Sequence, residues 1–254
     1  MTAPDAPAGS DRPLSLAGYR TILTEFLEAG YQVVSFTEPV PTTGPALILR
    51  HDLDVDPALA LPMAEVEADV GVRATYLALL TSPLYNPATA ANRATLAALA
   101  DQGHEVGLHF DASPHADLAD RDRALGTELA VLELLTGHHV RVASFHRPGP
   151  ATDTPELPGV VSAYEPRFVQ DLAYVTDSGG AFRYGHPMDS EAFAQRRGMQ
   201  LLTHPIWWSE HPMRDVTERI DAWHARHQNR LRNTLGANIR PYAEHLSTTG
   251  DHQL

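Results

Sequence analysis

Residues 46–54 read Ala-Leu-Ile-Leu-Arg-His-Asp-Leu-Asp, and this stretch decides the fold. Four consecutive apolar residues, from Ala46 to Leu49, follow a turn at residues 38–45 that contains Pro and Gly, and they predict a strand buried on both faces. Such strands are typical of parallel sheets whose faces are covered by helices. The strand runs directly into the ionisable residues of 50–54, so we expect chemistry at its carboxyl end.

Helical and strand patterns alternate on both sides of this stretch. Before it, apolar residues recur at helical spacing from Leu16 to Leu27, Gly30 is placed to end that helix, and a short strand is expected at 31–36. After it, we expect helices from Pro57 and over 88–100 and 120–135, and strands over 73–80, 104–110, 141–145, 172–176 and 200–203. Repeated strand and helix segments imply parallel βαβ units, which either close into a barrel or form an open doubly wound sheet.

The chain shows no internal repeat and no linker that would divide it. Residues 1–13, rich in Ala, Pro, Gly and Ser, have the composition of a flexible tail. We expect residues 14–254 to form a single domain. Apolar spacing in its last part predicts a C-terminal helix over 213–235.

The composition removes several kinds of chemistry. The 254 residues include no cysteine, and each of the 19 basic residues is an arginine, so lysine is also absent. Disulfides, thiolate metal sites, Cys nucleophiles, Schiff-base lysines and the P-loop lysine are therefore excluded. The 14 histidines become the residues of interest, because neutral imidazole is a common metal ligand and also a general acid or base.

Charge and hydropathy favour a cytoplasmic protein that binds neither nucleic acid nor membrane. The formal net charge of −13 opposes binding to a phosphate backbone, where affinity comes from cationic contacts. No apolar run approaches the roughly 18 to 20 residues that a membrane-spanning helix needs. The first 13 residues include Asp5 and Asp11 and lack the basic start and apolar core of a secretion signal.

Ionisable residues gather where the expected strands end. In parallel α/β folds the carboxyl ends of the strands converge on one mouth, and functional residues collect there. The residues at these positions are Asp52 and Asp54, His109 and Asp111, His146 and Arg147, Asp177 and Ser178, and finally His204. Scattered surface charge has no reason to choose these positions, so we expect them to surround one site.

The two aspartates that follow the buried strand predict a bound cation. Asp52 and Asp54 are two residues apart, so on a strand they face the same side, with His51 on the other. Two carboxylates this close stay ionised cheaply only when a cation or a positive side chain lies beside them. The structural alternative is that Asp54 caps the helix beginning near Pro57, since Asp is a common capping residue.

Residues 104–109, His-Glu-Val-Gly-Leu-His, resemble a zinc-protease helix only superficially. The two histidines are five residues apart rather than four, and a glycine interrupts the segment, so we reject a helix. On a strand, His104 and His109 point to opposite faces. His109 is then the residue at the mouth, although a lone histidine at a strand end is often a hydrogen-bonded structural residue.

Five short segments then follow one another in an order that is typical of one enzyme family. They are Arg50 to Asp54, Gly103 to His109, Phe145 to Pro148, Asp177 with Ser178, and Leu201 to Pro205. Together they resemble the polysaccharide deacetylase (NodB homology) superfamily, which includes carbohydrate esterase family 4, and more narrowly the subgroup whose first motif is Arg-His-Asp-x-Asp. The resemblance spans about residues 46–208. It implies a distorted (β/α) barrel, an α/β fold in which a divalent ion activates water to attack an amide carbonyl.

The resemblance implies roles for three residues at the metal and the water. Asp52 matches the base that takes a proton from water, Asp54 matches an aspartate ligand of the metal, and His109 matches the first histidine ligand. The family usually places its second histidine ligand four residues after the first. In this chain that position is Ser113.

The third protein ligand is therefore open among three residues. His146 is the preferred substitute, because it ends the next strand and directly precedes Arg147. His115 and Asp111 are the alternatives. In the absence of cysteine the ion must be held by nitrogen and oxygen, which suits Zn²⁺ best and leaves iron, cobalt, nickel or manganese open.

Three further residues are implied to serve the reacting groups. Arg147 matches the arginine of the third motif that holds the catalytic aspartate. His204 matches the histidine of the last motif that protonates the leaving amine. Asp177 matches an acid that orients this histidine.

We therefore expect a metal-dependent, deacetylase-like amide hydrolase that removes an acetyl group from an amino sugar or a sugar-bearing small molecule. One alternative keeps the scaffold and metal but acts on another C–N bond, in a cyclic amide or ureide. A second alternative is a catalytically silent member that only binds a carbohydrate or a partner protein, and Ser113 is its main support. The expected ligand is a small molecule or carbohydrate, and nothing in the sequence indicates an oligomeric state.

Overall fold

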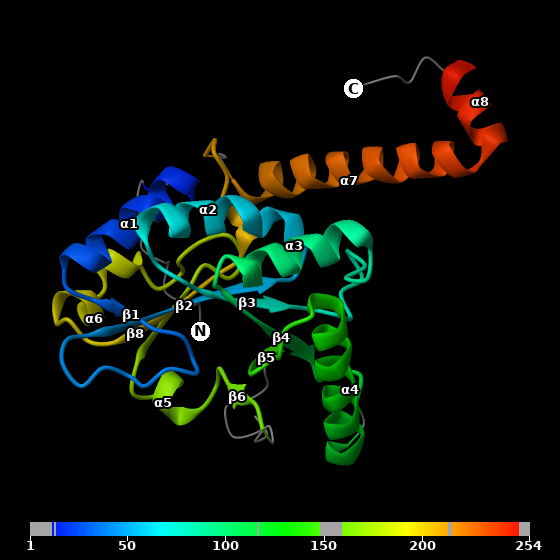
Figure 1. Ribbon diagram of the computed structural model, residues 1–254. Coiled ribbons are helices and arrows are strands. Elements are labelled where there is room, and N and C mark those ends of the chain that lie inside the picture. The colour runs from blue at the N-terminus through cyan, green and yellow to red at the C-terminus, as the bar shows by residue number, and fades with distance from the viewer. Residues whose placement is uncertain (1–11, 13, 116, 148–158, 213–214, 249–254) are drawn as a thin grey trace, which may run out of the picture. The chain divides into compact units, whose positions relative to one another are not determined.

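The computed structural model describes residues 12, 14–115, 117–147, 159–212 and 215–248 (Figure 1). By its internal contacts the chain divides into two compact units, Met1–Pro212 and Met213–Leu254. The first unit holds one parallel sheet and its helices, and the second holds two helices. The expected flexible tail, residues 1–13, lies outside the described residues except for Arg12. That residues 14–254 form one domain stays a prediction.

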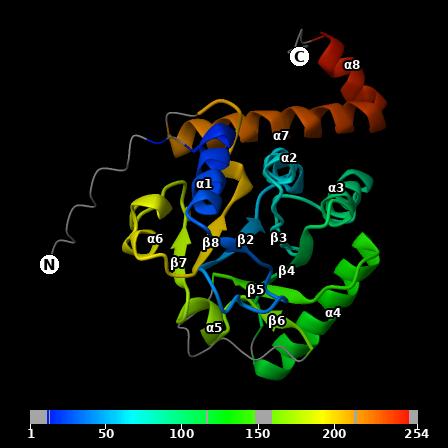
Figure 2. The same cartoon turned by 60° about the vertical axis from the view of Figure 1, so that its left-hand side comes forward.

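One sheet of eight parallel strands organises the first unit. The strands are β1 (Gln32–Val33), β2 (Ala46–Leu53), β3 (Thr75–Ala78), β4 (Glu105–Asp111), β5 (Val142–His146), β6 (Val161–Ser162), β7 (Ala173–Thr176) and β8 (Met199–Thr203). Their order is β6-β5-β4-β3-β2-β8-β7, with β1 beside the first part of β2. The described strands do not close into a ring, and Figure 2 shows the sheet curling between its edges at β7 and β6. The predicted distorted (β/α) barrel is confirmed, in a curled and incomplete form.

Strand β2 is central, as its apolar run predicts. All eight of its residues are buried, and it pairs with β8 on one side and β3 on the other. In this register His51 lies opposite Thr203, while Asp52 lies opposite Leu77. The carboxyl ends of β8, β2 and β3 are therefore adjacent, which is the arrangement that gathers side chains into one site.

Helices α1 (Leu16–Glu28), α2 (Leu61–Val70) and α3 (Ala90–Asp101) lie together over one face of the sheet (Figure 1). The first of them begins at Ser15, whose hydroxyl accepts a hydrogen bond from the Gly18 N–H at 3.1 Å. Its apolar positions recur at helical spacing, so Tyr19 and Phe26 are both buried against the core. The other helices of this unit are the long α4 (Leu118–Thr136) and the short α5 (Pro166–Val169), α6 (Glu191–Ala194), η3 (Pro187–Asp189) and η4 (Pro205–Trp207).

The chain after β2 turns into a helix without using Asp54. A single 3-10 turn, η1 (Pro57–Ala60), precedes α2, and the Asp56 carboxylate caps it by accepting a hydrogen bond from the Ala58 N–H at 3.2 Å. Asp56 thus takes the capping position that the structural alternative gave to Asp54.

Several elements differ in extent from the sequence expectation. The strand expected at 31–36 is only β1, because the chain turns at Ser35, whose N–H donates to the Glu38 carboxylate at 2.7 Å. Strand β6 and helices α5 and α6 have two to four residues each, too few for a periodic apolar pattern to reveal them.

Gly107 in the middle of β4 lets the neighbouring strands approach closely. A Cβ atom at this position would lie 2.5 Å from Leu77 Cδ2 and 2.6 Å from the Val142 carbonyl oxygen. No other residue fits there without displacing β3 or β5. This glycine therefore sets the position of β4 and of His109, which follows two residues later on the same face.

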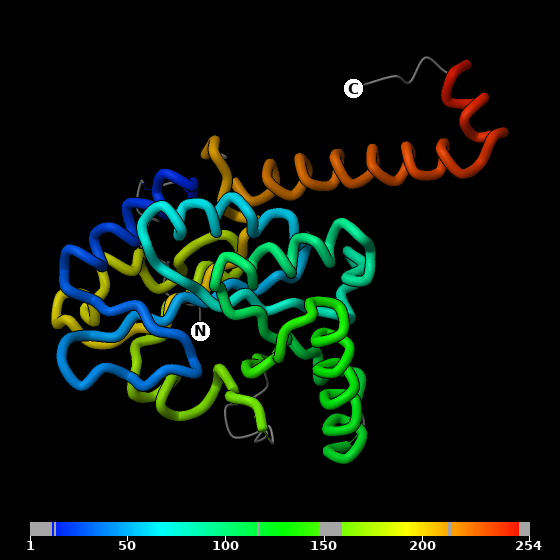
Figure 3. The backbone as a smooth tube through the Cα atoms, in the orientation of Figure 1, coloured from blue at the N-terminus to red at the C-terminus, as the bar shows by residue number. Residues whose placement is uncertain are grey.

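The second unit consists of α7 (Val216–Asn238) and α8 (Arg240–Thr248), with a break at Ile239 (Figure 3). The Asp215 carboxylate caps α7 by accepting from the Glu218 N–H at 2.8 Å. This helix confirms the C-terminal helix predicted from apolar spacing. Within the described residues, no helix has both the length and the apolar character that crossing a bilayer demands.

Candidate metal centre and active-site pocket

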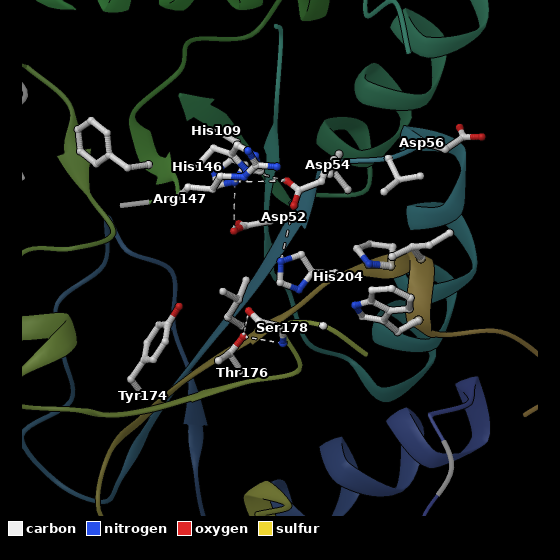
Figure 4. Close-up of a pocket in the computed structure, with 18 of the residues that line it drawn as sticks. Asp52, Asp54, Asp56, His109, His146, Arg147, Tyr174, Thr176, Ser178 and His204 are labelled. Carbon is white, nitrogen blue, oxygen red and sulfur yellow. Dashed lines mark hydrogen bonds and ion pairs between the residues drawn. The ribbon is translucent and has the colours of Figure 1, made fainter. Parts of the chain in front are cut away.

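A pocket of about 550 Å³ opens at the carboxyl ends of the parallel strands (Figure 4). Its walls include all but two of the strand-end residues expected from the sequence. The exceptions are Asp111, on the loop side of β4, and Asp177, which supports the pocket from behind. The lining residues that the argument uses are Asp52, Asp54, His109, His146, Arg147 and His204. The structure thus brings together side chains from β2, β4, β5 and the segment after β8, which are up to 152 residues apart in sequence.

Asp52 is held by Arg50, which precedes it by two residues on β2. Arg50 donates from Nε to Oδ1 at 2.9 Å and from Nη2 to Oδ2 at 2.8 Å, and the exposed fractions of the two side chains are 0% and 3%. Burial would raise the pKa of Asp52, but the charge and hydrogen bonds of Arg50 outweigh it, together with His109, and lower the pKa to about 2. Asp52 is therefore a carboxylate throughout the neutral range.

Three side chains, one on β4, one on β5 and one directly after β2, point their ligand atoms at one another. Oδ1 of Asp54 lies 3.3 Å from Nε2 of His109 and 3.7 Å from Nδ1 of His146, and the two ring nitrogens are 3.2 Å apart. Four ligands at about 2.0–2.1 Å from a tetrahedral ion are roughly 3.3 Å from each other. The spacing of these three atoms therefore matches a shared metal ion, and no other such group of His, Asp or Glu occurs among the described residues.

The hydrogen bonding of this triad also fits a cation. Oδ1 of Asp54 is buried and accepts no hydrogen bond from a described residue, which is costly for a carboxylate oxygen unless a cation lies beside it. Nδ1 of His109 lies 2.6 Å from the buried Ser144 hydroxyl, so Nε2 is the nitrogen left for a ligand. Burial lowers the pKa of His146, which keeps its ring in the neutral form that binds metals.

The two alternatives for the third ligand are occupied elsewhere. Nδ1 of His115 lies 3.0 Å from Oδ2 of Asp120, and its ring stacks on Phe110. The Asp111 carboxylate accepts from the Ser113 N–H at 2.9 Å. Ser113 itself is exposed on the loop after β4. His146 is therefore the residue whose geometry compensates for the serine at position 113.

His204 is oriented by Asp177, which is fully buried. Nδ1 of His204 lies 2.7 Å from Oδ1 of Asp177, and the His204 N–H and Trp208 Nε1 donate to the same carboxylate at 3.0 and 2.8 Å. Nε2 of His204 then faces the pocket, 3.8 Å from Oδ2 of Asp54. Burial alone would lower the pKa of this imidazole, but the hydrogen bond and charge of Asp177, with Asp52 and Asp54, raise it to about 9. His204 is a proton donor at neutral pH.

Arg147 does not have the position that the third motif implies for it. Among the described residues no hydrogen bond or ion pair joins Arg147 to Asp52, and the guanidinium on that carboxylate is Arg50. Arg147 is exposed, lines the pocket and has a φ of 52°. The physical reason is the i, i+2 spacing on β2, which delivers a guanidinium to Asp52 from within its own strand.

Neutral groups complete the walls of the pocket. Thr176 and Ser178, at the end of β7, join their hydroxyls at 2.7 Å, and both line the pocket with Trp207. Trp208 is buried and serves Asp177, so only the first of the two tryptophans is placed to contact a ligand. Hydroxyls and an aromatic side chain are the groups that commonly meet a sugar's hydroxyls and its apolar ring face.

A second cluster of ionisable residues lies on the opposite face of β2. Glu67 of α2 is fully buried and accepts from Tyr19 at 2.5 Å and from Tyr76 at 2.7 Å, and one of its oxygens lies 2.6 Å from Nε2 of His51. Nδ1 of His51 lies 2.6 Å from the Thr203 hydroxyl. Every partner in this cluster is internal, so it ties α1, α2, β2, β3 and β8 together.

Sequence reasoning missed Arg50 and Glu67. The signal for Arg50 was present, because a charged residue at the i−2 position of Asp52 shares its face on a strand. No comparable signal exists for Glu67, whose four partners Tyr19, His51, Tyr76 and His104 are scattered along the chain without a shared spacing.

No protein-family model matches the chain, and no curated protein matches it. It resembles solved structures in fold. A peptidoglycan deacetylase, PdaC from Bacillus subtilis, is 15% identical with a TM-score of 0.44, over 77% of this chain and 99% of that one. A family 4 acetyl xylan esterase from Clostridium thermocellum, in complex with a cobalt ion, is 15% identical with a TM-score of 0.38, over 71% and 84%.

A third similar structure is a family 4 pseudoenzyme from Bacillus anthracis, 16% identical with a TM-score of 0.41, over 75% of this chain. This chain spans 62% of the length of that one. Carbohydrate esterase family 4 is the family that the motifs predict. Identities this low describe the fold, so the chemistry is argued from the residues of this chain.

Proposed function

We propose that the protein belongs to the polysaccharide deacetylase (NodB homology) superfamily and is a metal-dependent N-deacetylase of an amino sugar or a sugar-bearing small molecule. One observation supports this above the others. The pocket combines a metal-ligand triad, Asp54 with His109 and His146, with an ionised acid on one side and a protonated histidine on the other. A base and an acid placed around a cation site are what amide hydrolysis requires.

Asp54, His109 and His146 would hold the ion. We propose Zn²⁺, because the donor set is one carboxylate and two imidazoles with no thiolate. When bound, such an ion acts as a Lewis acid that withdraws charge from the reacting oxygen atoms.

The protein's own residues move the protons. Asp52, kept ionised by Arg50, accepts the proton that the attacking water loses as its oxygen adds to the acetyl carbonyl carbon. His204, kept protonated by Asp177, gives its proton to the amide nitrogen as the C–N bond breaks. Acetate and a free amine leave, and one water has been consumed. General acid and base catalysis of this kind contributes about 10²–10⁴-fold each.

The walls of the pocket support a sugar as the substrate class. Thr176 and Ser178 offer hydroxyls, and Trp207 offers an aromatic surface, around a cavity large enough for one or two sugar rings. The names of the similar structures, a peptidoglycan deacetylase and an acetyl xylan esterase, point the same way. A cytoplasmic location remains part of the proposal and is tested by cell fractionation.

The rival proposal of a catalytically silent binding protein draws on Ser113 and on the similar pseudoenzyme. A protein that only binds its ligand would have no need to keep Asp52 ionised and His204 protonated beside the triad. With His146 as the proposed third ligand, the ligand set does not depend on residue 113, and the main support for that rival is lost.

Metal analysis and acetate release test the proposal together. The purified protein should hold about one divalent ion and should release acetate from N-acetylated sugars. Replacing His146→Ala should lower metal affinity by more than the 10- to 100-fold typical of lost supporting groups, and abolish acetate release. His115→Ala is the matched control and should keep both. A folded protein that binds no divalent ion, or equal loss in the two variants, would refute it.

A further inference from the structure

The pocket contains one arginine that the reaction does not use. Arg147 lines it from the end of β5, is exposed, and forms no ion pair with any described residue. It directly follows His146 in the chain, and both residues line the same pocket wall as Asp54 and His109. A permanent cation so close to the reacting groups calls for a function.

That function is not to hold Asp52, because Arg50 already does so completely. Both oxygens of Asp52 accept from Arg50, and Nε2 of His109 lies 3.5 Å from Oδ2. Arg50 is itself fixed from behind, with its guanidinium 5.0 Å from the centre of the Tyr164 ring. A carboxylate with two charge-assisted hydrogen bonds in a buried pair has no need of a second guanidinium.

The backbone of Arg147 is unusual as well. Its φ of 52° lies in the left-handed region that residues other than glycine seldom adopt, and Arg196 is the only other described non-glycine residue with a positive φ. Strain of this kind clusters at ligand-binding sites, where the surrounding structure holds a side chain in a required direction.

The charges on the walls show what Arg147 offers. Asp52, Asp54 and Asp56 line the pocket, and Arg147 is the only arginine among the described residues of its walls. Arg50 offsets Asp52, and a divalent ion would offset Asp54. Because the net charge of the chain is −13, this pocket would repel an anionic substrate unless the guanidinium of Arg147 paired with the anionic group. Guanidinium is suited to bind the paired oxygens of a carboxylate or a phosphate.

We propose that Arg147 is an anion-binding residue of the substrate pocket, so that the substrate carries a carboxylate or phosphate group in addition to its acetylated amine. The two arginines of the motifs have then exchanged tasks. Arg50 holds the base from within β2, and Arg147 recognises the substrate. This inference rests on the proposed deacetylase function and narrows its substrate class.

The test compares three acetylated sugars on the full-length, zinc-loaded protein. N-acetylglucosamine is neutral, N-acetylmuramic acid adds a carboxylate, and N-acetylglucosamine 6-phosphate adds a phosphate. The wild-type protein should prefer one of the two anions by kcat/KM, and the preferred anion identifies the group. Arg147→Gln should lower the ratio of kcat/KM for that anion over the neutral sugar by about tenfold or more, mainly through KM.

Two control variants make the outcome specific. Arg93→Gln removes the same charge from an exposed position on α3 and should leave the ratio unchanged. Arg50→Gln should lower kcat for all three sugars alike, because it acts through Asp52. Arg147→Lys should keep part of the preference, since it keeps the charge and loses the paired donors. A fall in kcat for the neutral sugar as large as that for the anions, in Arg147→Gln, would overturn the proposal.

Direct binding separates this inference from the proposed function. Calorimetric titration of each sugar into the metal-loaded protein measures affinity without turnover. If no sugar releases acetate, the deacetylase proposal fails, while tighter binding of an anion that Arg147→Gln abolishes would still support the anion site. Equal affinity for the neutral and anionic sugars in the wild-type protein would refute the anion site whatever the activity.

Discussion

The two faces of β2 hold similar side chains with opposite consequences. On one face, His51 and Glu67 meet two tyrosines and a threonine, and Glu67 is fully enclosed. On the other face, Asp52 and Asp54 meet His109, His146 and His204 around an open pocket. The adjacent residues His51 and Asp52 thus belong to two different clusters, one enclosed in the protein and one that lines an open pocket.

Hydrogen-bond completeness distinguishes the two clusters. Both oxygens of Glu67 and both nitrogens of His51 have protein partners, so these two side chains leave no donor or acceptor for a ligand. Nε2 of His104, beside them, is a single buried nitrogen without a hydrogen-bond partner among the described residues. Oδ1 of Asp54 is buried without a hydrogen-bond partner among the described residues, and it faces two imidazoles. The combination that indicates a cation is an unpartnered carboxylate oxygen whose nearest neighbours are two imidazole nitrogens, and it occurs on the open face.

The largest expected effect concerns metal binding on the open face. Asp54→Asn should lower zinc affinity by more than 100-fold, because a neutral amide replaces a charged ligand. The metal-free protein should change its unfolding free energy by only about 1 kcal/mol or less, since Oδ1 makes no hydrogen bond that would be lost. Zinc titration and urea unfolding of the metal-free protein measure the two quantities. If Asp54→Asn bound zinc as tightly as the wild type, the open face of β2 would not be a metal site, and its difference from the closed face would be refuted.

The closed face should show the opposite response, with a marked pH dependence. Burial would raise the pKa of Glu67, but the charge and hydrogen bond of His51, with His104 and Tyr19, lower it below its usual value. A carboxyl with a depressed folded-state pKa stabilises the protein above its unfolded pKa of about 4.3, and this stability is lost as pH falls through the folded pKa. Glu67→Gln should therefore cost about 3 kcal/mol at pH 7, and less as the pH falls below about 4.

Urea unfolding at several pH values between 3 and 7 measures this difference. Glu65→Gln is the matched control, because Glu65 is exposed on the same helix and should change the unfolding free energy by less than about 0.5 kcal/mol. A Glu67→Gln variant with the stability and pH profile of the wild type would show that the closed cluster does not act as an ionised unit.

The smallest effect is expected where the open face is supported from behind. Ser144 is fully buried and its hydroxyl lies 2.6 Å from Nδ1 of His109, which fixes the ring. Ser144→Ala should lower zinc affinity by about 10- to 100-fold, as the loss of such supporting groups usually does. Ser162→Ala, a buried serine on β6 away from the ligands, should leave zinc affinity unchanged. Equal affinities in both variants would show that His109 is oriented by other contacts.

Much of the fold follows from local patterns in the sequence. The buried run at β2 and the alternation of strands and helices predict the parallel sheet. A strand buried on both faces is recognisable from its continuous apolar residues alone, without knowledge of its neighbours in space. The extent of β1 and the existence of β6 depend on turns and pairings that a periodic pattern does not encode. The choice of the curled barrel came from the motifs.

The site was predictable to the extent that strand ends define it. Asp52, Asp54, His109, His146 and His204 were selected because parallel strands end at one mouth, and the structure places them in one pocket. The holder of Asp52 was predicted as Arg147 through the resemblance, whereas the structure places Arg50 there. The residue types and their order in the chain do not determine which of two arginines reaches a carboxylate. That depends on how side chains alternate along β2 and on the direction of the chain after β5.

The alternate placement of Arg50 and Asp52 on β2 and of Asp54 directly after it has a consequence for enzyme design. Under the proposed function, a proton acceptor, its counter-ion and a metal-coordinating group occupy five consecutive residues, so the end of one strand supplies them as a module. Transplanted into a buried parallel strand of another scaffold, this pentapeptide would bring its own charge compensation. The host would then need to supply only imidazoles from neighbouring strands.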